Sequence, residues 1–178
     1  MNISLEFFAA NVAIRARVAF CLAVAESVLI GLRSNTEGYL LAQEALNAAW
    51  KWQETSGVSG DTLAEYLDSY SGNDLGDIEA FYEDNELGLS ALIAVGLAVG
   101  YAAHYAYRLE GDEALPQFIE DGSEDTLIAV VNYASKTNLF DPSYVNRIVS
   151  FLLNLYKSNL NDYGTPVSRD ELLNLSAK

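Results

Sequence analysis

The segment from Leu87 to Tyr107 constrains the fold of this chain more than any other, because it contains no Asp, Glu, Lys or Arg. It is long enough to form a helix that either crosses a membrane or fills a protein core. His104 and three tyrosines interrupt its apolar character, and many of its other residues are Ala or Gly. Its flanks are acidic on one side and mixed on the other, so no positively charged anchor is present. We therefore expect a central core helix at 86–109 and no membrane insertion.

The hydrophobic pattern is helical in every other segment with a clear period, and no segment alternates as a strand does. Helix-start signals stand at Ser34–Glu37, Asp141–Pro142 and Ser168–Glu171. Residues 5–32 carry apolar side chains on nearly every face, which predicts one N-terminal core helix. Without a repeat or a long linker, we predict a single all-α domain over residues 1–178, a bundle of about six to eight helices around the central apolar helix.

The apolar stretch from Val18 to Leu32 lacks the layout of a secretory signal. Glu6 stands where positive charge is required, Glu26 interrupts the run, and no small-residue cleavage site follows it. We therefore expect a cytoplasmic protein.

Several kinds of site chemistry are disfavoured by the residue content. The 178 residues include one Cys and one His, which leaves no material for a disulfide framework, a zinc site or a His-dependent triad. No glycine-rich phosphate loop is present, and the acidic loops around Asp74 and Asp121 do not have the spacing of calcium ligands. A net charge of −15 repels phosphate and argues against direct nucleic-acid binding. We expect no enzymatic activity, no catalytic residue, no cofactor and no metal.

Two features allow more than one interpretation. Tyr101, His104, Tyr105 and Arg108 form a stripe at helical spacing, either a small-molecule pocket with a titrating imidazole or part of the core. We favour the core, because polar aromatic side chains commonly find internal partners there. Cys21, among Ala, Phe and Leu, is expected to be a buried apolar residue and not a reactive thiol.

The negative charge lies in one part of the chain. Residues 52–135 contain 17 acidic residues and one basic residue, whereas the remainder contains eight acidic and nine basic residues. A charge run of this kind is commonly a solvated surface. Because the acids are concentrated in the middle of the chain, we favour a face that binds a basic partner.

Helical spacing divides this face into stripes. Asp61, Glu65 and Asp68 are spaced i, i+4 and i+7, and Glu79, Glu83 and Glu86 repeat that spacing on a second short helix. Tyrosines on the same segments are candidate amphipathic anchors. The predicted partner-binding residues are Asp61, Glu65, Asp68, Asp74, Asp77, Glu79, Glu83, Asp84, Glu86, Tyr66, Tyr70 and Tyr82.

Three segments resemble a known family: Arg17–Glu26 (RVAFCLAVAE), Ala45–Glu54 (ALNAAWKWQE) and Ser59–Asp68 (SGDTLAEYLD). They resemble the all-α immunity proteins, family six, of bacterial polymorphic-toxin and contact-dependent inhibition systems. The resemblance implies a small cytoplasmic protein that is encoded beside a toxin, binds the toxin domain and blocks it. It implies no active site. Trp50 and Trp52 within the second segment either pack in the core or border the binding face.

The acidic segment adds one expectation of its own, namely a toxin domain with a basic substrate groove and hence a nuclease. Two alternatives remain open. The chain could mimic DNA to inhibit another nucleic-acid enzyme, or it could bind a small ligand around Tyr101, His104 and Tyr105. Self-association is not predicted by the sequence.

Overall fold

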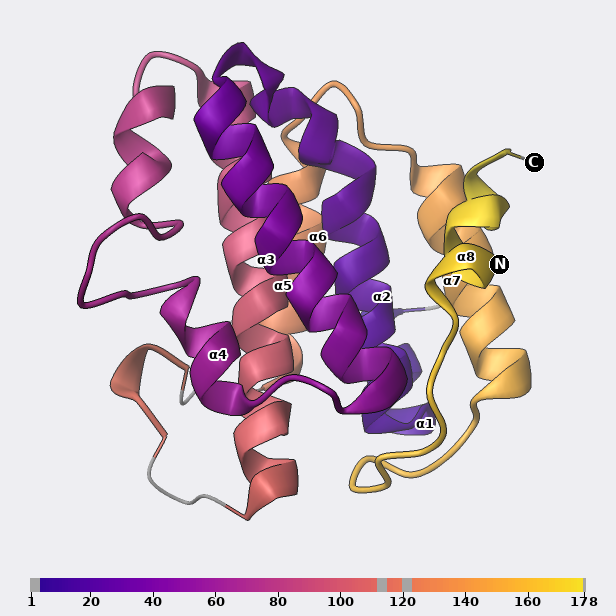
Figure 1. Ribbon diagram of the computed structural model, residues 1–178. Coiled ribbons are helices and arrows are strands. Elements are labelled where there is room, and N and C mark those ends of the chain that lie inside the picture. The colour runs from indigo at the N-terminus through magenta and orange to yellow at the C-terminus, as the bar shows by residue number, and fades with distance from the viewer. Residues whose placement is uncertain (1–3, 112–114, 120–122, 178) are drawn as a thin grey trace.

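The central helix α5 (Glu86–Glu110) organises the fold, and α2, α3, α4 and α6 all pack against it (Figure 1). The computed structural model describes residues 4–111, 115–119 and 123–177. The side chain of Asn85 caps the first turn of α5, and Gly111 ends it in the left-handed conformation at φ 79°. The helix is long and apolar enough to cross a membrane, yet 61% of its most apolar window is buried inside the protein. The expectation of a central, largely buried helix is confirmed.

The N-terminal region differs from the single helix expected over 5–32. It consists of α1 (Leu5–Asn11), α2 (Ile14–Val28) and the 3₁₀ helix η1 (Leu29–Ser34). At the break, the backbone N–H groups of Ala13, Ile14 and Arg15 donate to carbonyl groups of the segment that follows α7, at residues 156, 162 and 163. The first turn of α2 thus finds partners for its free N–H groups far away in the sequence. Local periodicity does not contain this information.

Two arginines of α2 are buried and bind backbone carbonyl groups. The Arg15 guanidinium donates to the carbonyl oxygens of Trp52 (3.2 Å) and Gln53, at the carboxyl end of α3, where a positive charge is favourable. Burial lowers the pKa of Arg15. Arg17 donates to the carbonyl oxygen of Leu160, 2.5 Å away. Both side chains therefore fasten distant segments to α2.

Helix α3 (Thr36–Thr55) contains both tryptophans. Its N-cap is Asn35, whose side chain accepts from the N–H of Gly38, and not Ser34 as the capping-box pattern predicted. Trp50 and Trp52 are each 1% exposed, so they belong to the core. The Trp50 indole donates to Glu26 at 2.8 Å.

The remaining helices are α4 (Gly60–Glu65), η2 (Asp77–Tyr82), η3 (Gln117–Ile119), α6 (Glu124–Ser135), α7 (Pro142–Leu155), α8 (Arg169–Leu173) and η4 (Asn174–Ala177). Among them, α7 and α8 begin at the predicted signals, with Asp141 and Ser168 as their N-caps. Asp141 caps α7 by accepting from the N–H of Ser143, which lowers the pKa of its carboxyl group. In the described residues there are eight α-helices and no strand, only an isolated bridge between Val12 and Lys157. The all-α prediction is confirmed.

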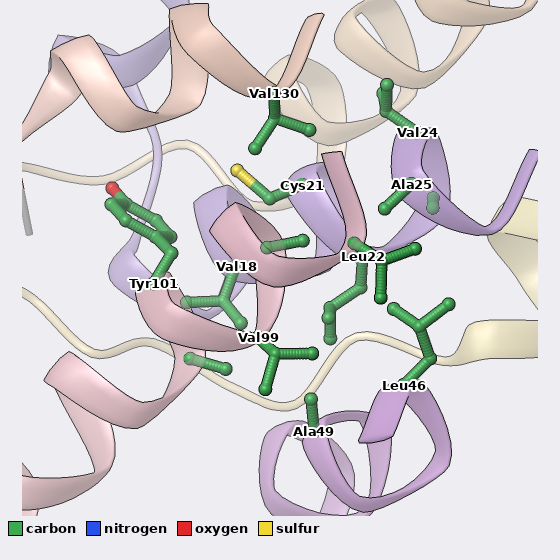
Figure 2. Packing of buried hydrophobic residues seen from close by; sticks show 14 of the residues in the cluster. Val18, Cys21, Leu22, Val24, Ala25, Leu46, Ala49, Val99, Tyr101 and Val130 are labelled. Atoms are coloured by element: carbon green, nitrogen blue, oxygen red, sulfur yellow. The ribbon is translucent and has the colours of Figure 1, made fainter. Parts of the chain in front are cut away.

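The core lies where α2 meets α3, α5 and α6 (Figure 2). Val18 and Leu22 of α2 point toward Val99 of α5 and Leu46 of α3 in this view. Cys21 is fully buried, and burial raises the pKa of its thiol well above the ordinary value. The thiol is therefore an apolar core group, as expected.

Candidate functional site: an acidic groove between α4 and α5

A groove of about 640 Å³ runs between α4, the segment after it and the C-terminal part of α5. It contains Asp61, Glu65 and Asp68, the first predicted acidic stripe, and all three side chains are exposed. We call this the acidic groove. Its lining residues are Asp61, Ala64, Glu65, Asp68, Ser69, Tyr70, Ser71, Tyr107 and Pro116.

Contacts with α5 hold α4 in place along the groove. The Ser59 hydroxyl caps α4 by accepting from the N–H of Thr62. The Tyr107 hydroxyl donates to Asp61 at 2.6 Å, and the N–H of Gly60 donates to Glu110 at 3.0 Å. Gly60 lies against the Tyr107 ring so closely that a Cβ atom would stand 2.7 Å from it. Glycine at this position permits the two helices to approach.

The acidic stripe is not a face of one helix, because α4 ends at Glu65. Asp68 reaches the groove through the folded segment after α4, in which the N–H of Leu75 donates to the carbonyl oxygen of Tyr66. Asp74 supports this segment: its carboxylate accepts from the N–H groups of Ser69 and Asp77, at 2.7 and 3.0 Å. Asp74, one of the predicted partner-binding residues, is buried, so little of it is available to a partner. Its hydrogen bonds position Asp68.

The three predicted tyrosine anchors have different environments. Tyr70 is fully exposed and lines the acidic groove, while Tyr66 is half-buried. Tyr82 is buried, and its hydroxyl donates to the carbonyl oxygen of Leu32 at 2.8 Å, so it cannot anchor a partner. Its neighbour Phe81 is 45% exposed and is the available aromatic side chain of η2.

The second predicted stripe is also spread over several elements. Glu79 lies in η2, Glu83 follows it, and Glu86 begins α5, so these residues do not form one helical face. They are exposed, as are Asp77 and Asp84. We call these five acids the η2 acidic segment.

No basic side chain neutralises the acidic groove within the described residues. The ion pairs found there are Arg147 with Asp141 (3.3 Å) and Arg169 with Glu26 (2.5 Å), and both of these acids lie outside residues 52–135. Four further acids of the central segment, at 112, 113, 120 and 121, lie outside the described residues. Uncompensated carboxylates beside a concave surface concentrate negative potential in the groove.

Three residues of the polar aromatic stripe of α5 belong to the core, and the fourth, Arg108, is exposed. Tyr101, His104 and Tyr105 are at most 9% exposed, and the Tyr101 and Tyr105 rings pack edge to face at 5.1 Å. Arg108 donates to Nε2 of His104 at 3.1 Å, so Nε2 accepts and Nδ1 carries the proton directed to the carbonyl oxygen of Ile119. The imidazole is therefore held by internal partners, and Tyr101, His104 and Tyr105 do not line the acidic groove.

Metal-binding clusters are absent from the part of the chain that the structure describes: no three His, Cys, Asp or Glu side chains stand close enough to share an ion.

The structure is thus an all-α bundle with a groove lined by three exposed carboxylates. The chain belongs to the immunity protein family Imm6, because the model of that family, Immunity protein Imm6, matches residues 16–137. The function associated with this family is immunity to a toxin. Nothing among the curated proteins or the solved structures matches the chain.

The segment that the family model matches, residues 16–137, is longer than the region of the three similar segments, which end at Asp68. It begins in α2 and ends just after α6, so every residue that lines the acidic groove falls within it. Helices α1, α7 and α8 lie outside it.

Proposed function

We propose that this immunity protein binds its cognate toxin domain at the acidic groove, and that the toxin domain is basic and of the nuclease class. The observation that carries the proposal is the groove itself, which Asp61, Glu65 and Asp68 line together with no Lys or Arg, and none of the three forms an ion pair within the described residues. An enzyme that cleaves nucleic acid must attract phosphate, and its substrate groove is therefore positively charged. The two surfaces have complementary charge.

Exposed aromatic residues give this electrostatic surface its anchors. Tyr70 offers a large amphipathic side chain inside the groove, and Phe81 offers a second one in η2. Interfaces obtain most of their binding energy from a few such side chains, whereas charges at the rim mainly govern association rate and orientation. We propose that binding takes place in the cytoplasm, where an immunity protein would meet a toxin that has entered.

The test is charge reversal at the groove. Asp61→Lys, Glu65→Lys and Asp68→Lys together should weaken binding to the toxin domain encoded by the neighbouring reading frame by about a thousandfold, measured by calorimetry. The double variant of Glu65 and Asp68 retains the Asp61–Tyr107 hydrogen bond and should show most of the loss.

A matched control makes the same charge change elsewhere. Glu6, Glu37 and Asp170 are exposed acids outside the central segment, and their reversal to Lys should change the affinity less than about threefold. Unchanged affinity in the groove variants, or equal losses in both sets, would refute the proposal. Isolation of the bound partner from producing cells also separates a toxin from an unrelated nucleic-acid enzyme inhibited by DNA mimicry.

A further inference from the structure

A second groove, of about 320 Å³, lies between α1 and the C-terminal part of α7. It is lined by Phe7, Asn11, Ser150, Leu153, Asn154 and Lys157. We call this the neutral groove. Figure 1 shows α7 on the opposite side of the molecule from α4, with α3 and α5 between them.

The walls of the neutral groove are held together by backbone contacts. Val12 and Lys157 form an antiparallel bridge, and the N–H of Ser158 donates to the carbonyl oxygen of Asn11 at 3.0 Å. Phe7 and Asn11 are one turn apart on α1, as are Ser150 and Asn154 on α7. Both walls are therefore rigid helical surfaces, which suits them to a preformed interface.

Phe7 gives this groove an unusually exposed apolar side chain, at 56%, and Leu153 also lines it. Among the large hydrophobic side chains of the described residues, only Tyr70 and Leu155 are more exposed, and neither of them lines this groove. Covering Phe7 would remove apolar surface from water, which favours association.

Charge indicates which partner can cover this surface. Two copies of a chain with a net charge of −15 repel each other wherever their acidic segments meet. In contrast, α1 carries only Glu6, α7 carries only Arg147, and Lys157 lines the groove. A basic toxin domain is not attracted to such a surface, whereas a second copy can approach it without charge repulsion.

We propose that the neutral groove is the interface of a symmetric homodimer. In a twofold arrangement the same patch is used by both copies, so Glu6 and Lys157 of one copy balance those of the other. The dimer leaves both acidic grooves facing outward, and each protomer binds one toxin domain. Because the remaining surfaces repel, dimerisation strengthens as salt screens the net charge.

Sedimentation of the full chain over a concentration series tests the proposal, at about 50 mM and about 500 mM NaCl. The expected result is a monomer–dimer equilibrium with a lower dissociation constant at the higher salt. Phe7→Glu should raise that constant by about tenfold or more, because it removes apolar contact and adds a like charge to both copies. Asn154→Glu, at a second exposed position that lines the groove, should act in the same direction.

The matched control is Leu40→Glu, which adds the same charge at a leucine of α3 that is 49% exposed, and it should leave the dimer within about twofold. A monomer at every concentration and both salt levels would overturn the proposal. A dimer that weakens with salt, or one indifferent to both groove variants, would also overturn it. If Phe7→Glu instead abolished toxin binding, the groove would belong to the toxin.

Discussion

The acidic groove and the neutral groove are built alike and differ in charge. Each lies between a short helix and a longer one, and each presents exposed apolar or aromatic side chains. The acidic groove lies inside a segment with 17 acids and one base, whereas the elements around the neutral groove carry almost balanced charge. The first lies within the Imm6 match and the second outside it. Shape alone therefore does not assign a partner, and charge separates a surface for a basic toxin from one for a like-charged copy.

Among single substitutions, the largest effect is expected from truncating the exposed aromatic side chain of each groove. Tyr70→Ala should weaken toxin binding by about 2–3 kcal/mol, or roughly a hundredfold, and leave dimerisation unchanged. Phe7→Ala should do the opposite. Calorimetry with the toxin domain and sedimentation of the free protein measure the two effects. If either variant impaired both associations equally, the comparison between the grooves would fail.

The next largest effect is expected from a substitution that blocks the close packing of α4 against α5. Gly60→Ala places a Cβ atom against the Tyr107 ring and should lower the free energy of unfolding by about 2 kcal/mol. Gly96→Ala, in the middle of α5, is the matched control, since its Cβ would meet nothing within 4 Å. It should stabilise the protein by about 0.5–1 kcal/mol through helix propensity. Urea unfolding distinguishes the two, and a stabilising Gly60→Ala would show that the contact is not tight.

A smaller effect is expected from the η2 acidic segment, which is exposed but does not line the acidic groove. Reversing Glu79, Glu83 and Glu86 to Lys should weaken toxin binding by about tenfold, mainly through slower association. Stopped-flow kinetics would separate the association and dissociation rates. A loss greater than that of the groove triple variant would move the principal contact from α4 to η2.

Much of the architecture follows from local sequence, but the details of the site do not. The limits of α5 and the start of α7 could be predicted, because a long uncharged segment and an Asp-Pro pair depend only on neighbouring residues. The break before α2 could not, since its first N–H groups are satisfied by residues 156–163. Periodicity also did not predict the environment of Tyr82, which is buried and donates to the carbonyl oxygen of Leu32, while its neighbour Phe81 is exposed.

The acidic groove, too, could be predicted only in part from the sequence. Asp61, Glu65 and Asp68 were identified from their charge and spacing, and the structure brings them together. Tyr107 and Pro116 were missed as lining residues, because only the packing of α4 on α5 places them there. Asp74 resembled its acidic neighbours in sequence, yet its carboxylate is used by two backbone N–H groups.

A last effect is confined to high pH and concerns the half of the molecule that carries the neutral groove. Burial raises the pKa of Tyr144 in α7 to about 12, and its hydroxyl donates to the carbonyl oxygen of Leu172. The folded state keeps this proton where the unfolded state has lost it, so the stabilisation is complete below pH 10 and declines as the pH rises toward 12. The loss should be about 2 kcal/mol by a pH of about 11.5.

Tyr144→Phe should flatten this alkaline decline, and Tyr70→Phe, at an exposed position, should leave it unchanged. Urea unfolding between pH 9 and about 11.5 measures the slope. An identical slope in Tyr144→Phe would show that other groups cause the decline.

The dependence of toxin affinity on salt tests the central claim most directly. If the acidic groove binds a basic surface, the logarithm of the dissociation constant should rise steeply with the logarithm of the salt concentration, by about tenfold or more between about 50 and about 500 mM NaCl. The Asp61, Glu65 and Asp68 triple reversal should flatten that slope, and the Glu6, Glu37 and Asp170 control should retain it. A flat slope in the unaltered protein, or a slope unchanged by the groove variant, would contradict the account.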